Sequence, residues 1–323
     1  MKTILNQSLR NIINERILVT GASGIIGKQL TKYLLLLGAK EIVCTSRIRR
    51  TSSDKRIIWK KVDLTSEDET QEVVKERSVI FHLAGIKYDT VSDSEVSSYG
   101  LNELITSNLV KCAAAHKIKK IIFTSSALVY GKPDKLPVQE SHKLRPISPY
   151  AKSKLSCEQI LLEFASQYPL KIVIARCCNI YGGKHEPETV IGRIIESIRE
   201  ESRIQLYHLN TVRDFIHLED AAEGLIRLGA YDDSKSSAII SNLTTSRGTS
   251  IKELTELAQS YWEEQGKGQL EVMEESPDAN IQIPELFLDN SFLKKITDWS
   301  PAVNIEEGLK RLLDRELKDS LNH

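Results

Sequence analysis

The feature that most constrains this chain is an alternation, from Arg16 to about Ala175, of short runs rich in isoleucine and valine with longer stretches of helical periodicity. This alternation is typical of βαβ units, whose parallel strands are buried on both faces by the connecting helices. Six strands with helices between them predict an α/β fold with a doubly wound parallel sheet. The predicted strands cover residues 16–20, 41–45, 57–62, 79–83, 120–125 and 171–175, and the predicted helices include residues 28–37 and 102–116.

Beyond Asn179 the alternation becomes less regular, and a loop with the sequence YGGKHEPET interrupts it. Thr249, Ser250 and Glu253 then have the spacing of a capping box, which predicts the start of an amphipathic helix. We expect a first domain over residues 1–178 and a smaller C-terminal domain over residues 179–323 that is interleaved with the first.

The composition excludes several classes of protein. Among 323 residues, 44 Lys and Arg face 44 Asp and Glu, so no overall charge favours binding to nucleic acid or to an anionic membrane. No apolar run reaches the ~20 residues of a membrane span, and the N-terminal residues lack the apolar stretch of a signal peptide. The cysteines show no CxxC spacing, which argues against disulfides and zinc knuckles. We expect a cytoplasmic protein with free thiols and no metal site.

A glycine-rich segment, TGASGIIG at residues 20–27, directly follows the first predicted strand and opens the first predicted helix. In this position Gly21 allows a tight turn, Gly24 lets a pyrophosphate approach the backbone, and Gly27 lets helix and strand pack closely. The helix N-terminus then points toward the phosphates. This placement predicts a dinucleotide-binding domain of the Rossmann type over residues 1–178. The turn residues expected to bind the cofactor are Gly21, Ser23, Gly24, Ile25, Ile26 and Gly27.

The end of the second predicted strand indicates which dinucleotide binds. An acidic residue there accepts hydrogen bonds from the adenosine ribose, whereas an arginine accommodates a 2′-phosphate. The chain has Thr45, Ser46 and Arg47 at this place, followed by Arg49 and Arg50, and no carboxylate. NADP is therefore favoured over NAD. The alternative is that these arginines only belong to a solvated basic loop.

Tyr150 and Lys154 predict a general acid/base. They stand four positions apart after Pro149, where a helix is expected to begin, and residues at this spacing share one helix face. A cation beside a phenol lowers the phenol pKa from about 10 toward neutral pH, as proton exchange with a sugar or alcohol hydroxyl requires. Ser126 ends the fifth predicted strand, where side chains reach the ligand crevice of such sheets, so its hydroxyl can bind the same substrate oxygen.

Taken in order, these segments resemble the extended short-chain dehydrogenase/reductase family, in particular its nucleotide-sugar epimerases and reductases. The resemblance covers residues 16 to about 314. It implies that Tyr150 is the acid/base and that Lys154 binds the nicotinamide ribose and tunes Tyr150. It also implies that Ser126 orients the reacting oxygen and that Asn102 supports the site. The matching segments are TGASGIIG (20–27), Asp63 in VDL, HLAG (82–85), SSALVYG (125–131), PYAKSK (149–154), NIYG (179–182), RDFIHLED (213–220) and ITDWSP (296–301).

The resemblance also assigns binding residues. Asp63 is expected to contact the adenine, and Asn179 and Arg213 are expected to bind a substrate diphosphate. Many members pair as homodimers through the helix that carries the tyrosine, so a homodimer is expected, although core packing uses the same apolar residues. Outside the glycine-rich turn, the expected cofactor residues are Ser46, Arg47, Asp63, Leu64, Leu83, Ala84, Gly85 and Lys154, and the expected substrate residues are Ser126, Tyr150, Asn179 and Arg213.

The chain departs from the family pattern in three places. Sugar 4,6-dehydratases of the family carry an Asp-Glu pair where this chain has Ala127 and Leu128, so an elimination is disfavoured. The residue before Thr106 is usually glycine, and here it is Ile105. Epimerases complete a diphosphate clamp with a second arginine, but residues 248–303 contain none. Lys267 is the candidate to replace it, as a point charge.

The sequence leaves three functions open. The first is hydride transfer at a ring carbon of a nucleotide-activated sugar, either as an epimerase that regenerates its cofactor or as a reductase that consumes NADPH. The second keeps the same catalytic residues but reduces a carbonyl compound that is not a nucleotide. The third is a dinucleotide sensor without catalysis, which the intact Tyr150 and Lys154 disfavour because a sensor needs neither.

Overall fold

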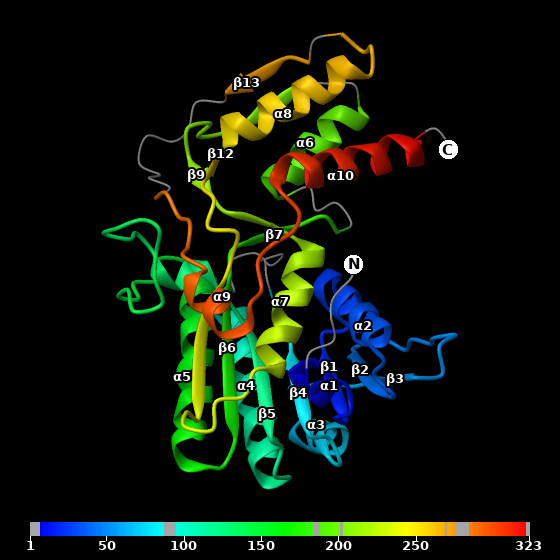
Figure 1. Cartoon of the computed structure of the whole chain (residues 1–323), viewed down its shortest axis with the longest axis vertical. Coiled ribbons are helices and arrows are strands. Elements are labelled where there is room, and N and C mark those ends of the chain that lie inside the picture. Colours follow the sequence, from blue (N-terminus) through cyan, green and yellow to red (C-terminus); the bar gives the residue numbers. More distant parts are fainter. Residues whose placement is uncertain are drawn as a thin grey trace.

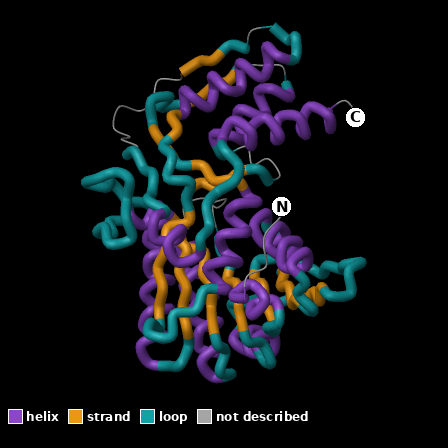
Figure 2. The backbone as a smooth tube through the Cα atoms, viewed as in Figure 1, coloured by secondary structure: helices purple, strands orange, loops and turns teal. Residues whose placement is uncertain are grey.

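The computed structural model describes residues 7–86, 95–183, 188–200, 203–268, 270–274 and 284–320, and Figures 1 and 2 show how its elements are arranged. Its centre is a seven-stranded sheet in the order β11-β6-β5-β4-β1-β2-β3, with every neighbouring pair parallel. The predicted doubly wound sheet is therefore confirmed. The six predicted strands are β1 (Ile17–Thr20), β2 (Ile42–Ser46), β3 (Ile57–Lys61), β4 (Val79–His82), β5 (Lys120–Ser126) and β6 (Lys171–Cys177).

Helices cover both faces of the sheet because neighbouring strand residues point to opposite sides. Ile17 and Val19 of β1 pack in a core with α1 (Gln7–Ile13), α2 (Ile25–Leu37) and α7 (Leu218–Ala230). Leu18, between them, packs in a second core with α3 (Glu67–Val74), α4 (Glu95–Ala115) and α5 (Pro149–Gln167). Burial on both faces explains why these strands read as continuous apolar runs.

The seventh strand, β11 (Ala238–Leu243), was not predicted. It pairs with β6 at one edge of the sheet, and its sequence, AIISNL, mixes apolar with polar residues. Ser241 and Asn242 are nonetheless fully buried. The strand lacks the continuous apolar run by which the other strands were found, so periodicity alone could not detect it.

The rest of the C-terminal half forms a separate layer with its own core. Figure 1 shows this layer beyond the end of the sheet from which β7 (Asn179–Tyr181) continues. It contains α6 (Val190–Arg199), β8 (Ile204–Leu206), α8 (Ile251–Glu264), β13 (Val272–Glu274) and α10 (Ile305–Ser320). The predicted helix start is confirmed, since Ser250 caps α8 and its Oγ accepts a 3.0 Å hydrogen bond from Glu253 N.

Short elements connect the two layers. β7 pairs with β10 (Phe215–His217), and β9 (Val212–Arg213) pairs with β12 (Thr249–Ser250). The 3-10 helix η1 (Ala127–Tyr130) follows β5 directly, and α9 (Ser291–Thr297) packs against β11. Residues beyond 178 thus belong partly to the sheet layer and partly to the second layer, and the domain boundary after residue 178 stays a prediction.

All five cysteines are buried and free. Burial raises the pKa of Cys44 to about 11 and that of Cys177 to about 12, so these thiols remain protonated and pack as small apolar side chains. Within the ranges that the structure describes, no helix is long and apolar enough to cross a membrane.

The turn between β1 and α2 leaves no room for a side chain at Gly21 or Gly27. Gly21 has φ +64°, and a Cβ there would lie 2.7 Å from the backbone N of Ala84. A Cβ on Gly27 would lie 2.5 Å from the carbonyl oxygen of Gly21. Both contacts are with backbone atoms, so they can be relieved only by moving β1, α2 or the end of β4.

Replacing Gly27 should therefore strain this turn. We expect Gly27→Ala to lower the free energy of unfolding by about 1–3 kcal/mol, as overpacking does. The matched control is Gly100→Ala, an exposed site within α4 with no atom inside 4 Å of the new methyl group. It should be neutral or stabilising by up to about 1 kcal/mol. Urea unfolding measures both variants, and equal stabilities would contradict the close packing inferred for Gly27.

Candidate active site

Parallel strands place their carboxyl ends at one edge of the sheet, and this edge carries most of the predicted site residues. Thr20, Ser46, His82 and Ser126 end β1, β2, β4 and β5. The chain order reverses between β1 and β4, which are neighbours in the sheet. Ligands of doubly wound sheets bind at such a reversal, so the crevice expected from the sequence lies beside these two strands.

The start of α2 borders this crevice. Its N-cap residue, Gly24, provides no side-chain hydrogen bond to the first-turn amides. A Cβ on Gly183 would lie 2.9 Å from Ile25 Cγ2, so the segment after β7 lies against the same turn. Arg315 of α10 donates hydrogen bonds to the carbonyl oxygens of Gly182 and Gly183, at 3.2 and 2.6 Å. The sequence analysis missed Gly183 and Arg315, although NIYG pointed to this segment.

These features fit a dinucleotide. Gly21 and Gly27 have no space for a Cβ, which keeps the turn packed tightly against the backbone around it. The uncapped amides and dipole of the α2 N-terminus suit a pyrophosphate. Gly21, Ser23, Gly24, Ile25, Ile26 and Gly27 are the turn residues that would hold it.

His82 connects β1, β4 and α4 through two threonines. Its Nδ1 lies 2.9 Å from Thr20 Oγ1, and its Nε2 lies 3.2 Å from Thr106 Oγ1. Thr20 Oγ1 also accepts hydrogen bonds from the amides of Leu83 and Ala84, both at 3.2 Å. The hydroxyl of Thr20 is thus left to donate to Nδ1, and Nε2 donates to Thr106. His82 thereby fixes the backbone of Leu83 and Ala84, two predicted cofactor residues.

Asn102 joins the end of β4 to the start of α5. Its Oδ1 accepts a 2.7 Å hydrogen bond from Ile86 N, and its Nδ2 donates to Ile86 O at 3.2 Å. The same Nδ2 donates to Ser153 Oγ at 3.2 Å, and Ser153 donates to the carbonyl of Tyr150 at 2.9 Å. A Cβ on Gly85 would lie 3.2 Å from Asn102 Oδ1, so Gly85 belongs to the same cluster.

Tyr150 and Lys154 meet on one face of α5, whose first turn is capped by Ser148. Lys154 Nζ lies 6.0 Å from the Tyr150 ring centroid and donates a 2.8 Å hydrogen bond to Thr124 O. It would lie 3.7 Å from a Cβ on Gly85. Burial lowers the pKa of Lys154. The phenol of Tyr150, on a half-buried residue, thus has a buried amine beside it.

Ser126 lies two residues beyond the carbonyl that holds Lys154. It is half-buried, and its Oγ accepts a 3.2 Å hydrogen bond from Leu128 N as the cap of η1. Its hydroxyl proton is free to be donated elsewhere because the oxygen acts as acceptor in this cap. Helix α5 also packs against η1. The strand end, the helix face and Asn102 are therefore neighbours.

The ends of β2 and β3 carry the residues expected at the adenosine. Ser46 Oγ accepts a 3.3 Å hydrogen bond from Arg50 Nε, and the Arg50 guanidinium lies 5.8 Å from the Trp59 ring centroid. Asp63 Oδ1 accepts hydrogen bonds from Thr65 N and Oγ1, at 3.0 and 2.7 Å. These bonds, with the charge of Arg47, lower the pKa of Asp63. Arg50, and not Arg47, thus bonds to Ser46.

Asn179 and Arg213, the expected diphosphate contacts, lie close together. Asn179 Nδ2 donates to Asp214 O at 3.0 Å. Arg213 Nη1 donates to Val212 O at 2.9 Å and to Pro284 O. Burial lowers the pKa of Arg213.

Lys267 cannot complete a clamp with Arg213, and that interpretation is wrong. Arg213 pairs with Thr249, just before the start of α8, whereas Lys267 follows the end of this 14-residue helix. The helix separates the two by ~21 Å at 1.5 Å per residue. The Lys267 ammonium lies 5.6 Å from the Trp262 ring centroid instead.

Comparison with known proteins gives a consistent family assignment. Residues 17–243 match the model of the family described as "NAD dependent epimerase/dehydratase family". A UDP-glucose 4-epimerase of Rhizobium meliloti is 30% identical over 75% of this chain and 80% of its own length.

Solved structures of similar fold are consistent with this family assignment. A UDP-glucose 4-epimerase from Bifidobacterium longum, in complex with NAD+ and UDP, is 26% identical with a TM-score of 0.80, covering 94% of this chain and 98% of that one. A UDP-glucose 4-epimerase from Thermotoga maritima, solved with UDP-glucose, has a TM-score of 0.82 at 24% identity, covering 94% of this chain and 99% of that one, and supports the fold.

The buried His82 predicts an acid-sensitive fold. Burial lowers its pKa to about 3, whereas the unfolded chain protonates this group near pH 6.5. As pH falls from about 6.5 toward 3, the unfolded state binds a proton that the folded state does not. This group should then lower the free energy of unfolding by up to ~1.4 kcal/mol per pH unit.

We expect His82→Gln to reduce the slope of the free energy of unfolding against pH by the equivalent of about one bound proton. Glutamine is neutral, and it has one acceptor and one donor group for Thr20 and Thr106. Urea unfolding at several pH values between 4.5 and 7 would measure this slope. The range extends about two pH units below the pKa of a free histidine. The same slope in both proteins would show that His82 is not the group responsible.

Proposed function

The chain belongs to the NAD dependent epimerase/dehydratase family, the extended short-chain dehydrogenase/reductase enzymes, and on that premise we propose that it epimerises a nucleotide-activated hexose. The observation that carries the proposal is the convergence of Tyr150, Lys154 and Asn102 on the ends of β4 and β5. UDP-hexoses are the first substrates to test, since the relatives reported above are named for UDP-glucose.

Each residue of the site has a separate role in the proposed reaction. A bound nicotinamide dinucleotide would supply the acceptor and donor of hydride. Tyr150 takes the proton of the sugar hydroxyl and later returns it, and the Lys154 ammonium favours the phenolate form that accepts this proton. The Ser126 hydroxyl donates to the reacting oxygen and orients it. Asn102 holds the first turn of α5 against the end of β4, so that these groups keep their places.

The residues after Ser126 favour epimerisation over elimination. Ala127 is buried and Leu128 is exposed, and both belong to η1. Neither can exchange a proton, so the acid and base that a dehydration needs are missing at this strand end. On the substrate side, Asn179 and Arg213 are proposed to bind the diphosphate, Arg213 as its single arginine.

The cofactor is proposed to be NADP. Arg50 is held between Ser46 Oγ and the Trp59 ring, so its guanidinium is oriented before a 2′-phosphate arrives. A preference for NADP also favours the other form of this hydride transfer, a nucleotide-sugar reductase that consumes NADPH. We further propose a homodimer, with exposed Leu101 and Leu104 on α4 as part of its surface.

The test of the acid/base is Tyr150→Phe. The variant should bind the dinucleotide with unchanged affinity but lose about 10²- to 10⁴-fold in kcat, as expected when a general acid/base is removed. Interconversion of UDP-glucose and UDP-galactose measures turnover, and stoichiometric loss of nicotinamide absorbance would identify a reductase instead. Tyr168→Phe, an exposed tyrosine at the other end of α5, is the control and should keep full activity. Unchanged turnover in Tyr150→Phe would overturn the assignment.

The test of the cofactor is Arg50→Ala. Losing a charged hydrogen bond of about 1.5–3 kcal/mol should weaken NADP binding by roughly 10- to 100-fold and leave NAD binding nearly unchanged. Arg49→Ala, a nearby exposed arginine, is the control. Dissociation constants for both dinucleotides decide the matter: an equal effect on each would mean that Arg50 does not recognise a 2′-phosphate.

A further inference from the structure

Three polar residues form a row across neighbouring strands just before the carboxyl edge of the sheet. Ser125 of β5 pairs in register with Arg176 of β6, and Arg176 pairs with Asn242 of β11. Residues paired in register point to the same face of the sheet. All three are buried, with Ser125 4%, Arg176 3% and Asn242 0% exposed, so their polar groups must be satisfied inside the protein.

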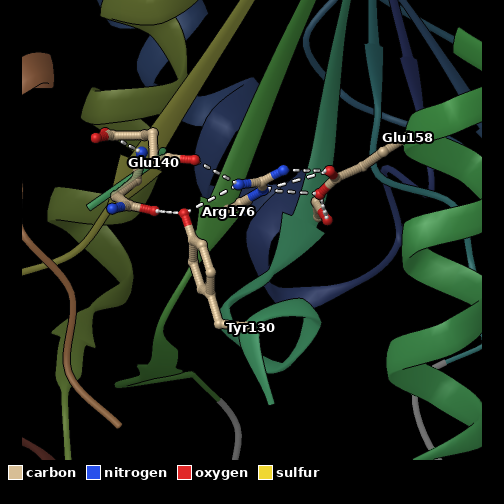
Figure 3. A network of polar contacts seen from close by, with 6 residues as sticks. Tyr130, Glu140, Glu158 and Arg176 are labelled. Carbon is tan, nitrogen blue, oxygen red and sulfur yellow. Dashed lines mark hydrogen bonds and ion pairs between the residues drawn. The ribbon is translucent and has the colours of Figure 1, made fainter. Parts of the chain in front are cut away.

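Glu158 of α5 closes this row on one side. Its carboxylate accepts hydrogen bonds from Arg176 Nε, at 3.2 and 3.3 Å, and from Arg176 Nη2, at 2.8 Å. The hydroxyl of Ser125 donates to the same carboxylate. Figure 3 shows the Arg176 guanidinium lying between Glu158 and the phenol of Tyr130. A forked guanidinium with a carboxylate fixes orientation as well as distance.

Tyr130 and Asn242 extend the network on the other side. Arg176 Nη1 donates to Tyr130 OH at 3.1 Å and to Glu140 O at 3.2 Å. Burial raises the pKa of Tyr130 to about 12, so its phenol stays protonated and donates to Asn242 Oδ1 at 2.7 Å. Asn242 Nδ2 then donates to Val138 O at 2.9 Å. The network thus runs without a break from α5, across β5 and β6, to β11.

The position of the network relates it to the site. Tyr150, Lys154 and Glu158 are spaced by four residues and share one face of α5. Lys154 is bonded to residue 124 and Glu158 to residue 125, so two successive turns of the helix hold two successive residues of β5. Ser126 is the next residue. A shift of Glu158 would therefore move α5 relative to the strand end that carries Ser126.

Stability alone is a poor explanation for this arrangement. A buried ion pair is often replaceable by apolar residues without loss of stability, because desolvation offsets the attraction between the charges. The surrounding core, which includes Leu161 and Ile174, is apolar. The forked Arg176–Glu158 pair fixes the direction of the contact between helix and strand, and it also bonds Ser125 and Tyr130. Apolar packing provides neither of these.

We propose that Arg176 and Glu158 are positioning residues, which hold the helix face of Tyr150 and Lys154 at the correct place relative to Ser126. The inference rests on the proposed function, since it assumes that these three groups act on the substrate. Neither Arg176 nor Glu158 touches substrate in this account. They act through Ser125 and through α5.

The experiment uses two substitutions of Arg176. Arg176→Met removes the fork and the charge, whereas Arg176→Lys keeps a charge but cannot form the fork or reach Tyr130 at the same time. Because small misplacements of reacting groups cost on the order of 10²-fold in rate, both variants should lose roughly 10- to 100-fold in kcat. The affinity for the dinucleotide and the KM for the UDP-hexose should change little. Arg176→Lys keeps the proposal testable if Arg176→Met fails to fold.

The matched control is Leu161→Ala, three residues after Glu158 on the same helix. Leu161 is fully buried against the sheet, so the substitution destabilises α5 by about 2–5 kcal/mol without touching the network. All variants are assayed at a temperature where each remains folded. The control should keep its kcat. If Leu161→Ala loses as much turnover as Arg176→Met, or if Arg176→Lys turns over as fast as the wild type, the network is structural only.

A second measurement separates this inference from the proposed function. Amide hydrogen exchange in the dinucleotide-bound protein needs no substrate. Arg176→Met and Arg176→Lys should raise exchange both at residues 124–128 and at residues 148–154, whereas Leu161→Ala should not raise it at residues 124–128. A wild type that converts no UDP-hexose would count against the proposed function alone. Unchanged exchange at residues 124–128 in both Arg176 variants would overturn the positioning role.

Discussion

The hydrogen bond from the buried ammonium of Lys154 to the carbonyl of Thr124 is the contact on which the site depends. A buried cation is costly unless its donors are satisfied, and here a strand carbonyl at 2.8 Å and the Phe123 ring at 4.7 Å surround it. The same contact ties α5 to β5 at the edge of the sheet where ligands bind. The same buried position thus lowers the pKa of Lys154 and brings its charge close to the Tyr150 ring.

Much of this arrangement could be predicted from the sequence because its determinants are local. Strands β1, β2, β4, β5 and β6 are buried on both faces, so their apolar runs stood out. Gly21 needs a positive φ and Gly27 a close approach to its neighbour, and both requirements involve residues of one short turn. Ser250 caps α8 with an amide three residues away. The pairing of Tyr150 with Lys154 likewise needs only the geometry of one helix.

The parts that escaped prediction depend on contacts between distant residues. Strand β11 keeps Asn242 buried because Tyr130, 112 residues earlier, bonds to it, and no window of sequence contains both. The orientation of Arg50 depends on both Ser46 and the Trp59 ring in the next strand. The error on Lys267 came from the direction of α8, which carries it away from Arg213. In each case the contact depends on how distant elements pack together. The hydrophobic periodicity of the sequence carries no information about that packing.

The side chain of Glu140 bonds to the backbone of β11, the strand at one edge of the sheet. β11 is an edge strand, and such strands expose unpaired backbone groups that can recruit another chain. Here the Glu140 carboxylate accepts the outward N–H of Asn242 at 2.9 Å, and α9 packs beside the strand. The Glu140 side chain thus occupies one of the backbone donors at this border, so that donor is not available to pair with another chain.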